Sequence, residues 1–100
     1  MMRALRTDAN LTSIVTVLRK AGCSVHVTNG MWDLTVSVGN AVMLLEVKDP
    51  RKPPSQRRRT PAQTKWLQTW QSECRLILSP EDALEAVSTL RRWASKLKEQ

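Results

Sequence analysis

The sequence has few of the features that mark secreted or membrane proteins. It contains only two cysteines, Cys23 and Cys74, whose wide separation gives neither a zinc-ligand spacing nor a dense disulfide framework. The longest unbroken apolar run, residues 41–45, is far shorter than a membrane span, and residues 1–11 lack the apolar core of a signal peptide. These absences predict a soluble protein in the reducing cytoplasm, with no membrane partner.

Acidic residues are absent from one long stretch, which runs from Pro50 to Ser72. This stretch contributes strongly to a net charge of +7 and a pI near 10.3. Such a surface favours polyanionic partners, and we expect its cations to contact the phosphate backbone of a nucleic acid, although a merely solvated loop is the simpler alternative. The six candidate nucleic-acid-binding residues are Arg51, Lys52, Arg57, Arg58, Arg59 and Lys65.

One hundred residues with 41% apolar side chains are enough for a single domain, residues 1–100, with its core in about residues 7–90. Helical spacing of apolar residues predicts helices over 8–21, from the Thr60 cap to about 72, and from 80 through 90. Alternating or continuous apolar residues predict strands at 23–27, 34–38, 41–48 and 74–78, the third of them central and covered on both faces. Prolines forbid regular structure in the basic loop, residues 49–60. The order αβββαβα predicts an α/β fold with a central mixed sheet flanked by helices.

Three charged residues of the second and third strands form the candidate site. Glu46 and Lys48 share one face of a strand because side chains alternate. If a Gly39-Asn40 turn pairs Val38 with Ala41, Asp33 lies opposite Glu46. Two carboxylates this close repel each other when desolvated, and a divalent cation between them relieves the repulsion. Oxygen ligands from Asp33, Glu46 and the Val47 carbonyl suit Mg²⁺ or Mn²⁺, and Lys48 would hold a nucleophilic water or neutralise a bound phosphate.

This pattern resembles the PD-(D/E)XK nuclease superfamily, and within it the single-domain VRR-NUC and phage-type Holliday junction resolvase nucleases. The resemblance covers about residues 7–90 and includes the restriction-endonuclease-like αβββαβ order. It is carried by Asp33-Leu34, by Glu46-Val47-Lys48, by the Arg57 to Arg59 run, and by Thr60-Pro61-Ala62-Gln63.

The resemblance implies an endodeoxyribonuclease that hydrolyses phosphodiester bonds with Mg²⁺. In it Asp33 and Glu46 would be metal ligands, Lys48 the catalytic lysine, and Gln63 an auxiliary polar group of the catalytic site. It further implies a homodimer acting on branched DNA, such as four-way junctions, in the cytoplasm of a bacterium or a phage-infected host cell.

The sequence departs from the family pattern at two positions. Trp32 stands where a proline usually precedes the acid, and the first helix reads Asn10-Leu11-Thr12-Ser13 where many relatives have a metal-binding glutamate. Asp8 replaces that glutamate, or no residue does. A DNA-binding or architectural module that has weakened or lost hydrolysis is therefore the alternative function, and an RNA-binding or protein-interaction module is a third.

Other side chains have simpler structural interpretations. Gln63 is also the third-position partner of Thr60 in a capping box, a role compatible with a place in the site. Trp66 and Trp70, four residues apart on one helical face, are expected to pack in the core rather than stack on bases. His26 is expected to face solvent or to form a hydrogen bond rather than to bind a metal.

Overall fold

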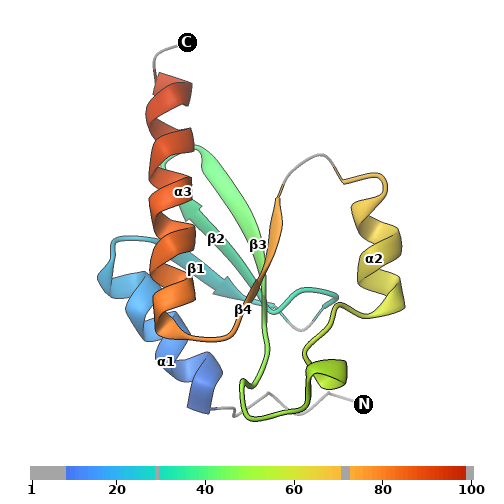
Figure 1. Cartoon of the computed structure of the whole chain (residues 1–100). Helices are drawn as coiled ribbons and strands as arrows, with labels where there is room; N and C mark the ends of the chain where they lie inside the picture. Colours follow the sequence, from blue (N-terminus) through green and yellow to red (C-terminus); the bar gives the residue numbers. More distant parts are fainter. Residues whose placement is uncertain (1–8, 29, 71–72, 99–100) are drawn as a thin grey trace.

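The computed structural model describes residues 9–28, 30–70 and 73–98, and its elements follow the predicted order (Figure 1). Four strands form one mixed sheet in the order β1-β2-β3-β4, with β1, β2 and β3 antiparallel and β4 parallel to β3. The part of the chain described is thus an α/β fold with a mixed sheet and three α-helices, as predicted. The elements are α1 (Ala9–Lys20), β1 (Ser24–Val27), β2 (Leu34–Val38), β3 (Ala41–Val47), the 3-10 turn η1 (Pro54–Gln56), α2 (Pro61–Leu67), β4 (Cys74–Ile77) and α3 (Pro80–Lys98).

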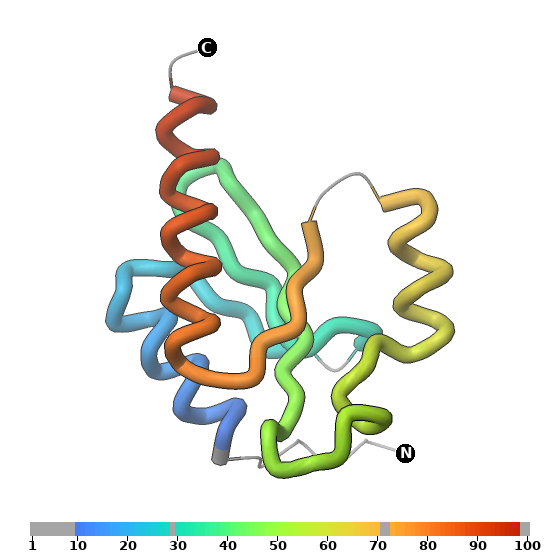
Figure 2. The backbone as a smooth tube through the Cα atoms, viewed as in Figure 1, coloured from blue at the N-terminus to red at the C-terminus, as the bar shows by residue number. Residues whose placement is uncertain are grey.

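Helices α1 and α3 cover one face of the sheet, and α2 lies on the other side (Figures 1 and 2). Alternate strand residues point toward α1 and α3, where they are almost fully buried. Apolar residues of the two helices at helical spacing complete this core. The strand residues in it are Leu34, Val36, Ala41, Met43, Leu45, Val47 and Ile77, and the helical ones include Leu11, Ile14, Leu18, Ala83, Val87 and Leu90.

The face toward α2 is covered less completely. On β3, Val42 is 48% exposed and Leu44 is half-buried, so the prediction that this strand is covered on both faces is wrong. The strand is internal in the sheet, as predicted, but a helix of seven residues cannot cover the whole of its second face.

Helix α2 ends at Leu67, before the predicted end near residue 72. The amides of Gln68 and Thr69 donate to carbonyls three residues back, and the Thr69 hydroxyl also donates to the Trp66 carbonyl. Threonine hydroxyls that compete for backbone groups in this way weaken a helix.

The two tryptophans of this region are not core residues, contrary to the prediction. Trp66 is half-buried and Trp70 is 41% exposed, and neither belongs to the apolar core under α1 and α3. Their rings instead contact each other, because residues four apart lie on the same side of a helix.

The turn at Gly39 and Asn40 fixes the register of the hairpin. Gly39 has φ of 56°, as glycine does at the first central position of a two-residue hairpin turn, and Val38 pairs with Ala41 as assumed from the sequence. The pairing continues to Leu34 with Leu45, so Asp33 and Glu46 are the next residues on the two strands.

The basic loop differs from the prediction in one place, the 3-10 turn η1, where the prolines were expected to prevent regular structure. Pro54 occupies its first position, which needs no amide hydrogen and suits the fixed φ of proline. The cysteines Cys23 and Cys74 are both buried and free, and His26 is exposed on β1, as expected. Among the described residues, none of the helices is long and apolar enough to span a membrane.

Candidate metal centre

The β2–β3 hairpin brings Asp33 and Glu46 together at the ends of their strands. Asp33 extends β2, since its amide donates to the Leu45 carbonyl (3.1 Å) and its own carbonyl accepts from the Thr28 amide (2.8 Å). Its carboxylate oxygen Oδ2 accepts a hydrogen bond from the Val47 amide (2.9 Å). This bond crosses from one strand to the other and places the Asp33 side chain beside residues 46 and 47.

Glu46 and Lys48 lie on the same face of β3, as the alternation predicts. The Lys48 Nζ is 3.1 Å from Glu46 Oε2, and the side chains are only 17% and 10% exposed, respectively. The intervening Val47 and the preceding Leu45 point into the core and are fully buried. The charged pair thus belongs to the α2 side of the sheet, and the apolar neighbours that hold the strand belong to the other side.

Gln63 joins the helix α2 to this group. Its side-chain nitrogen Nε2 donates to the Met31 carbonyl (2.7 Å), and its side-chain oxygen Oε1 accepts from the backbone amide of Thr60 (2.9 Å). The same side chain lies beside Glu46 and acts to lower the pKa of that carboxyl. The predicted capping box is present, because the backbone amide of Gln63 donates to the Thr60 hydroxyl (3.1 Å). Gln63 is 1% exposed, so one buried side chain both caps α2 and contacts the candidate centre.

The environment of Glu46 makes its ionised form less favourable than it is in water. Burial raises the pKa of the Glu46 carboxyl above its usual range, and the neighbouring Asp33 carboxylate raises it further. Hydrogen bonds from Gln63 and Lys48 act in the opposite direction but do not cancel the effect. A carboxyl held in this way gains from a nearby cation, because the cation stabilises the charge that burial disfavours.

The donor set fits an ion that needs few protein ligands. Among the described residues, no three His, Cys, Asp or Glu side chains gather to hold a metal by themselves. Mg²⁺ commonly takes one or two carboxylates and keeps water in its remaining positions. In a β-strand, the N–H and C=O groups of one residue point toward the same neighbouring strand. The Val47 N–H points to Asp33, so the Val47 carbonyl faces that side of β3 as well.

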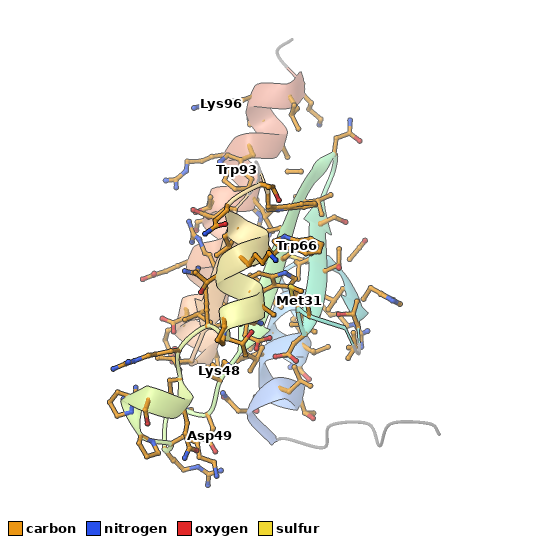
Figure 3. All side chains as sticks on the ribbon, turned by 90° about the vertical axis from the view of Figure 1, so that its right-hand side faces the viewer. Met31, Lys48, Asp49, Trp66, Trp93 and Lys96 are labelled. Carbon is orange, nitrogen blue, oxygen red and sulfur yellow. The ribbon has the colours of Figure 1, made fainter. Side chains whose placement is uncertain are left out.

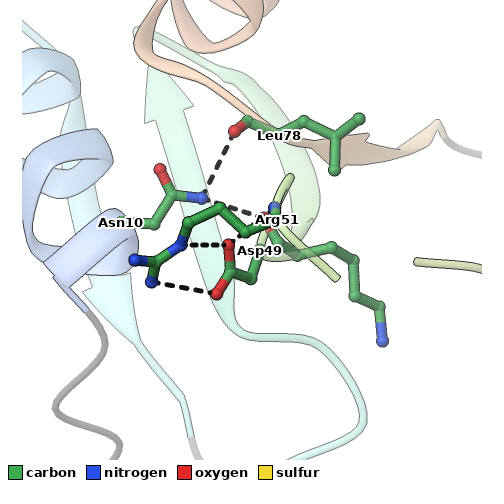
Figure 4. Close-up of polar contacts among 5 residues, drawn as sticks. Asn10, Asp49, Arg51 and Leu78 are labelled. Carbon is green, nitrogen blue, oxygen red and sulfur yellow. Dashed lines mark hydrogen bonds and ion pairs between the residues drawn. The ribbon is translucent and has the colours of Figure 1, made fainter. Parts of the chain in front are cut away.

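Asn10, whose position alone was notable in the sequence because it stands in place of a glutamate, ties together the ends of two strands through its side chain. The Asn10 Nδ2 donates to the carbonyls of Lys48 (2.8 Å) and Leu78 (3.3 Å), just beyond β3 and β4 (Figure 4). The Lys48 amide in turn donates to the Ile77 carbonyl (3.0 Å). Asn10 thereby fixes the backbone that carries the lysine. Asp8, the other candidate for the glutamate, lies outside the described residues.

Trp32, which precedes Asp33, is buried (4% exposed), and its carbonyl accepts a hydrogen bond from the Thr28 hydroxyl. Figure 3 views the molecule from the α2 side and shows Lys48 and Asp49 at the end of the molecule that carries the basic loop.

The predicted DNA-binding residues fall into two groups. Lys52, Arg58 and Lys65 are exposed, as is Arg51, whose guanidinium forms an ion pair with Asp49 (3.1 Å, Figure 4) and holds the pKa of that carboxyl below its usual range. Arg59 is exposed as well, but its guanidinium donates to the Cys74 carbonyl (2.7 Å), and Arg57 is half-buried with its Nε enclosed by protein. Arg57 and Arg59 form the second group, because part of each side chain lies against the protein.

Comparison with known proteins gives no relative: no family model matches the chain, and no curated protein or solved structure shows significant similarity.

Proposed function

We propose that the protein is a Mg²⁺-dependent DNA endonuclease of the PD-(D/E)XK type, whose centre consists of Asp33, Glu46, Lys48 and Gln63. The observation that carries the proposal is the convergence of these four side chains, from three different segments, at the partly covered face of the sheet. Two carboxylates and a lysine in mutual contact are costly to bury unless the site uses them.

Each residue has a role that its position supports. Asp33, Glu46 and the Val47 carbonyl would hold the metal, and the Asp33 bond to the Val47 amide keeps these groups in fixed relation. Mg²⁺, when bound, supplies a Lewis acid for the phosphate and lowers the pKa of water. Lys48 has three N–H donors, so it can keep its bond to Glu46 and donate to a phosphate oxygen or to the attacking water. Gln63 keeps Glu46 oriented.

The exposed cations of the acid-free segment would bind the DNA backbone next to this centre. Backbone contacts of this kind position a substrate and carry no sequence information, so we expect cleavage that depends on the shape of the DNA and falls steeply with salt. Branched DNA, cut by a homodimer, is the finer part of the proposal, and it rests on the resemblance alone.

A binding module without hydrolysis is the second candidate, and Asn10 favours it. The side-chain amide of Asn10 donates to two carbonyls, at the position where many of the nucleases that the sequence resembles have a metal-binding glutamate. Calorimetry with Mg²⁺ or Mn²⁺ separates the two candidates, because a pure binder shows no Asp33-dependent uptake of metal.

The deciding experiment incubates the protein with labelled four-way junction, flap and linear duplex DNA, with Mg²⁺ or with EDTA. We expect cleavage with Mg²⁺ and none with EDTA. The cleavage rate should fall by about a thousandfold in Glu46→Ala and Lys48→Ala proteins that still bind DNA. Glu85→Ala and Lys96→Ala, exposed on α3, are the matched controls and should cut normally. Cleavage retained by either centre variant would place the catalytic site elsewhere.

A further inference from the structure

Gln63, Trp66 and Trp70 form a stripe on one side of the α2 segment, because residues three and four apart share a helical face. The helical turn continues past α2, since the Trp70 amide donates to the Trp66 carbonyl (3.1 Å). The two indole rings lie 5.1 Å apart at 40° to each other. The stripe thus begins with an amide in contact with Glu46 and continues into a pair of aromatic rings.

Packing does not account for this pair. Trp70 is 41% exposed and Met31, whose carbonyl binds Gln63, is 40% exposed. Figure 3 shows Met31 and Trp66 at the face of the molecule that α2 occupies. Burying a large aromatic side chain is among the stronger contributions to stability, and these rings leave part of that contribution unused. Trp66 is half-buried with its indole Nε1 enclosed by protein, so Trp70 and Met31 supply most of the exposed area. The surface that Met31, Trp66 and Trp70 leave exposed is here called the α2 platform.

Charge around the α2 platform selects the chemistry of a ligand that binds there. The platform's two tryptophans lie within the acid-free segment, and the exposed Lys65 precedes Trp66 on the same helix. An exposed indole ring on a segment that also presents a lysine suits a nucleobase that stacks and a phosphate that pairs with the lysine. Bases in a duplex are already stacked, so only an unpaired base can use such a surface.

We propose that the α2 platform stacks an unpaired nucleobase and so directs the protein to nucleic acid with single-stranded segments. Trp70 lies seven positions after Gln63, which is about 10 Å along a helix and about three base steps. A base on Trp70 would therefore lie a few nucleotides from the phosphate at the centre. The position of the stacked base relative to the cleaved phosphate rests on the proposed function. The stacking of an unpaired base on the α2 platform does not.

Binding is tested in the full-length Glu46→Gln protein with EDTA, so that hydrolysis plays no part. The probes are labelled fifteen-nucleotide oligo(dT) and oligo(U), which separate DNA from RNA, and a fifteen-base-pair duplex, all measured by fluorescence anisotropy. Trp70→Ala should weaken binding of a single strand by about five- to a hundredfold, as expected for one stacked base, and change duplex binding less than about twofold. Trp70→Phe keeps an aromatic ring and should retain single-strand affinity within about threefold.

The control is Leu84→Ala, which removes a similarly exposed apolar side chain from α3 (49% exposed). It should change neither the single-strand nor the duplex affinity. Unchanged single-strand binding in Trp70→Ala, or equal losses on duplex and single strand, would overturn the proposal. So would a dimer in sedimentation that Trp70→Ala dissociates, because a second copy would then occupy the surface. Trp70-dependent binding without any cleavage would disprove the nuclease and leave this inference standing. Cleavage together with single-strand binding that does not depend on Trp70 would do the reverse.

Discussion

The face of the sheet toward α1 and α3 and the face toward α2 are made by alternate residues of the same strands, yet they serve different purposes. The first contains the fully buried apolar side chains Leu45 and Val47, and the second contains Glu46 and Lys48 between and beside them. Helices of 12 and 19 residues cover the first face, and a helix of seven residues lies over the second. The difference teaches that the stability of the fold comes mainly from the face toward α1 and α3. The face toward α2 can therefore carry charged groups that lower the stability.

The sharpest test of this comparison uses two neighbouring leucines of β3. Leu45→Ala should reduce the free energy of unfolding by about 2–5 kcal/mol, because Leu45 is fully buried and its loss leaves a cavity. Leu44→Ala should cost about 1 kcal/mol or less, because Leu44 is half-buried on the α2 side. Urea unfolding of both variants measures the difference, and equal losses would mean that the two faces contribute equally.

Asn10 links the stable face to the candidate centre, so its loss should affect both. Asn10→Ala leaves the Lys48 and Leu78 carbonyls without this donor and should cost about 1–3 kcal/mol of stability. We also expect slower cleavage well below the melting temperature, with little change in KM, because the lysine loses its backbone support. Ser13→Ala, at an exposed position of α1, is the control. Normal kcat in a destabilised Asn10→Ala protein would restrict Asn10 to a structural role.

The cap of α2 should matter less, because this helix covers its face only in part. Thr60→Ala removes the hydroxyl that accepts from the backbone amide of Gln63, and it should lower the free energy of unfolding by about 1 kcal/mol. Since Gln63 also lies beside Glu46, the Mg²⁺ affinity of the Thr60→Ala protein, measured by calorimetry, should be lower than that of the parent protein. Exposed Thr64→Ala, on the same helix, should leave the affinity unchanged.

The smallest expected effect on stability is a gain. A carboxyl whose pKa is raised in the folded protein binds its proton more tightly there than in the unfolded chain, so stability falls as pH rises from the unfolded to the folded pKa. In EDTA, Glu46→Gln should match the parent protein at low pH and melt at a slightly higher temperature above that window. Mg²⁺ should stabilise the parent protein only above the window. A lower melting temperature for Glu46→Gln at neutral pH would show that the ionised carboxylate stabilises the fold, and Glu85→Gln serves as the control.

The hairpin and the carboxylate pair could be predicted from sequence because local rules determine them. A two-residue turn at Gly39 sets the register, and the register places Asp33 beside Glu46. The capping box was equally local, since its two members lie three residues apart. These features depend on spacing along the chain and not on how distant segments pack.

What failed depended on contacts between distant segments. Periodicity shows that Trp66 and Trp70 share a helical face but not whether a partner covers that face, and here the covering is incomplete. The bonds from Asn10 to Lys48 and from Arg59 to Cys74 join residues far apart in sequence, and no spacing rule predicts them. Such pairings follow from tertiary packing, which a single sequence does not specify by pattern.

The turn at Gly39 and Asn40 controls the chemistry of a centre at the other end of the hairpin. Side chains alternate with a period of two, so one inserted residue in this turn would shift the pairing by one position. Glu46 would then be directed toward α3, and Leu45 would take its place among polar groups. A change in chain length at a solvent-exposed turn would thus exchange the polar and apolar faces of β3. The charged side chains would then have to enter the apolar core, which the fold would not tolerate.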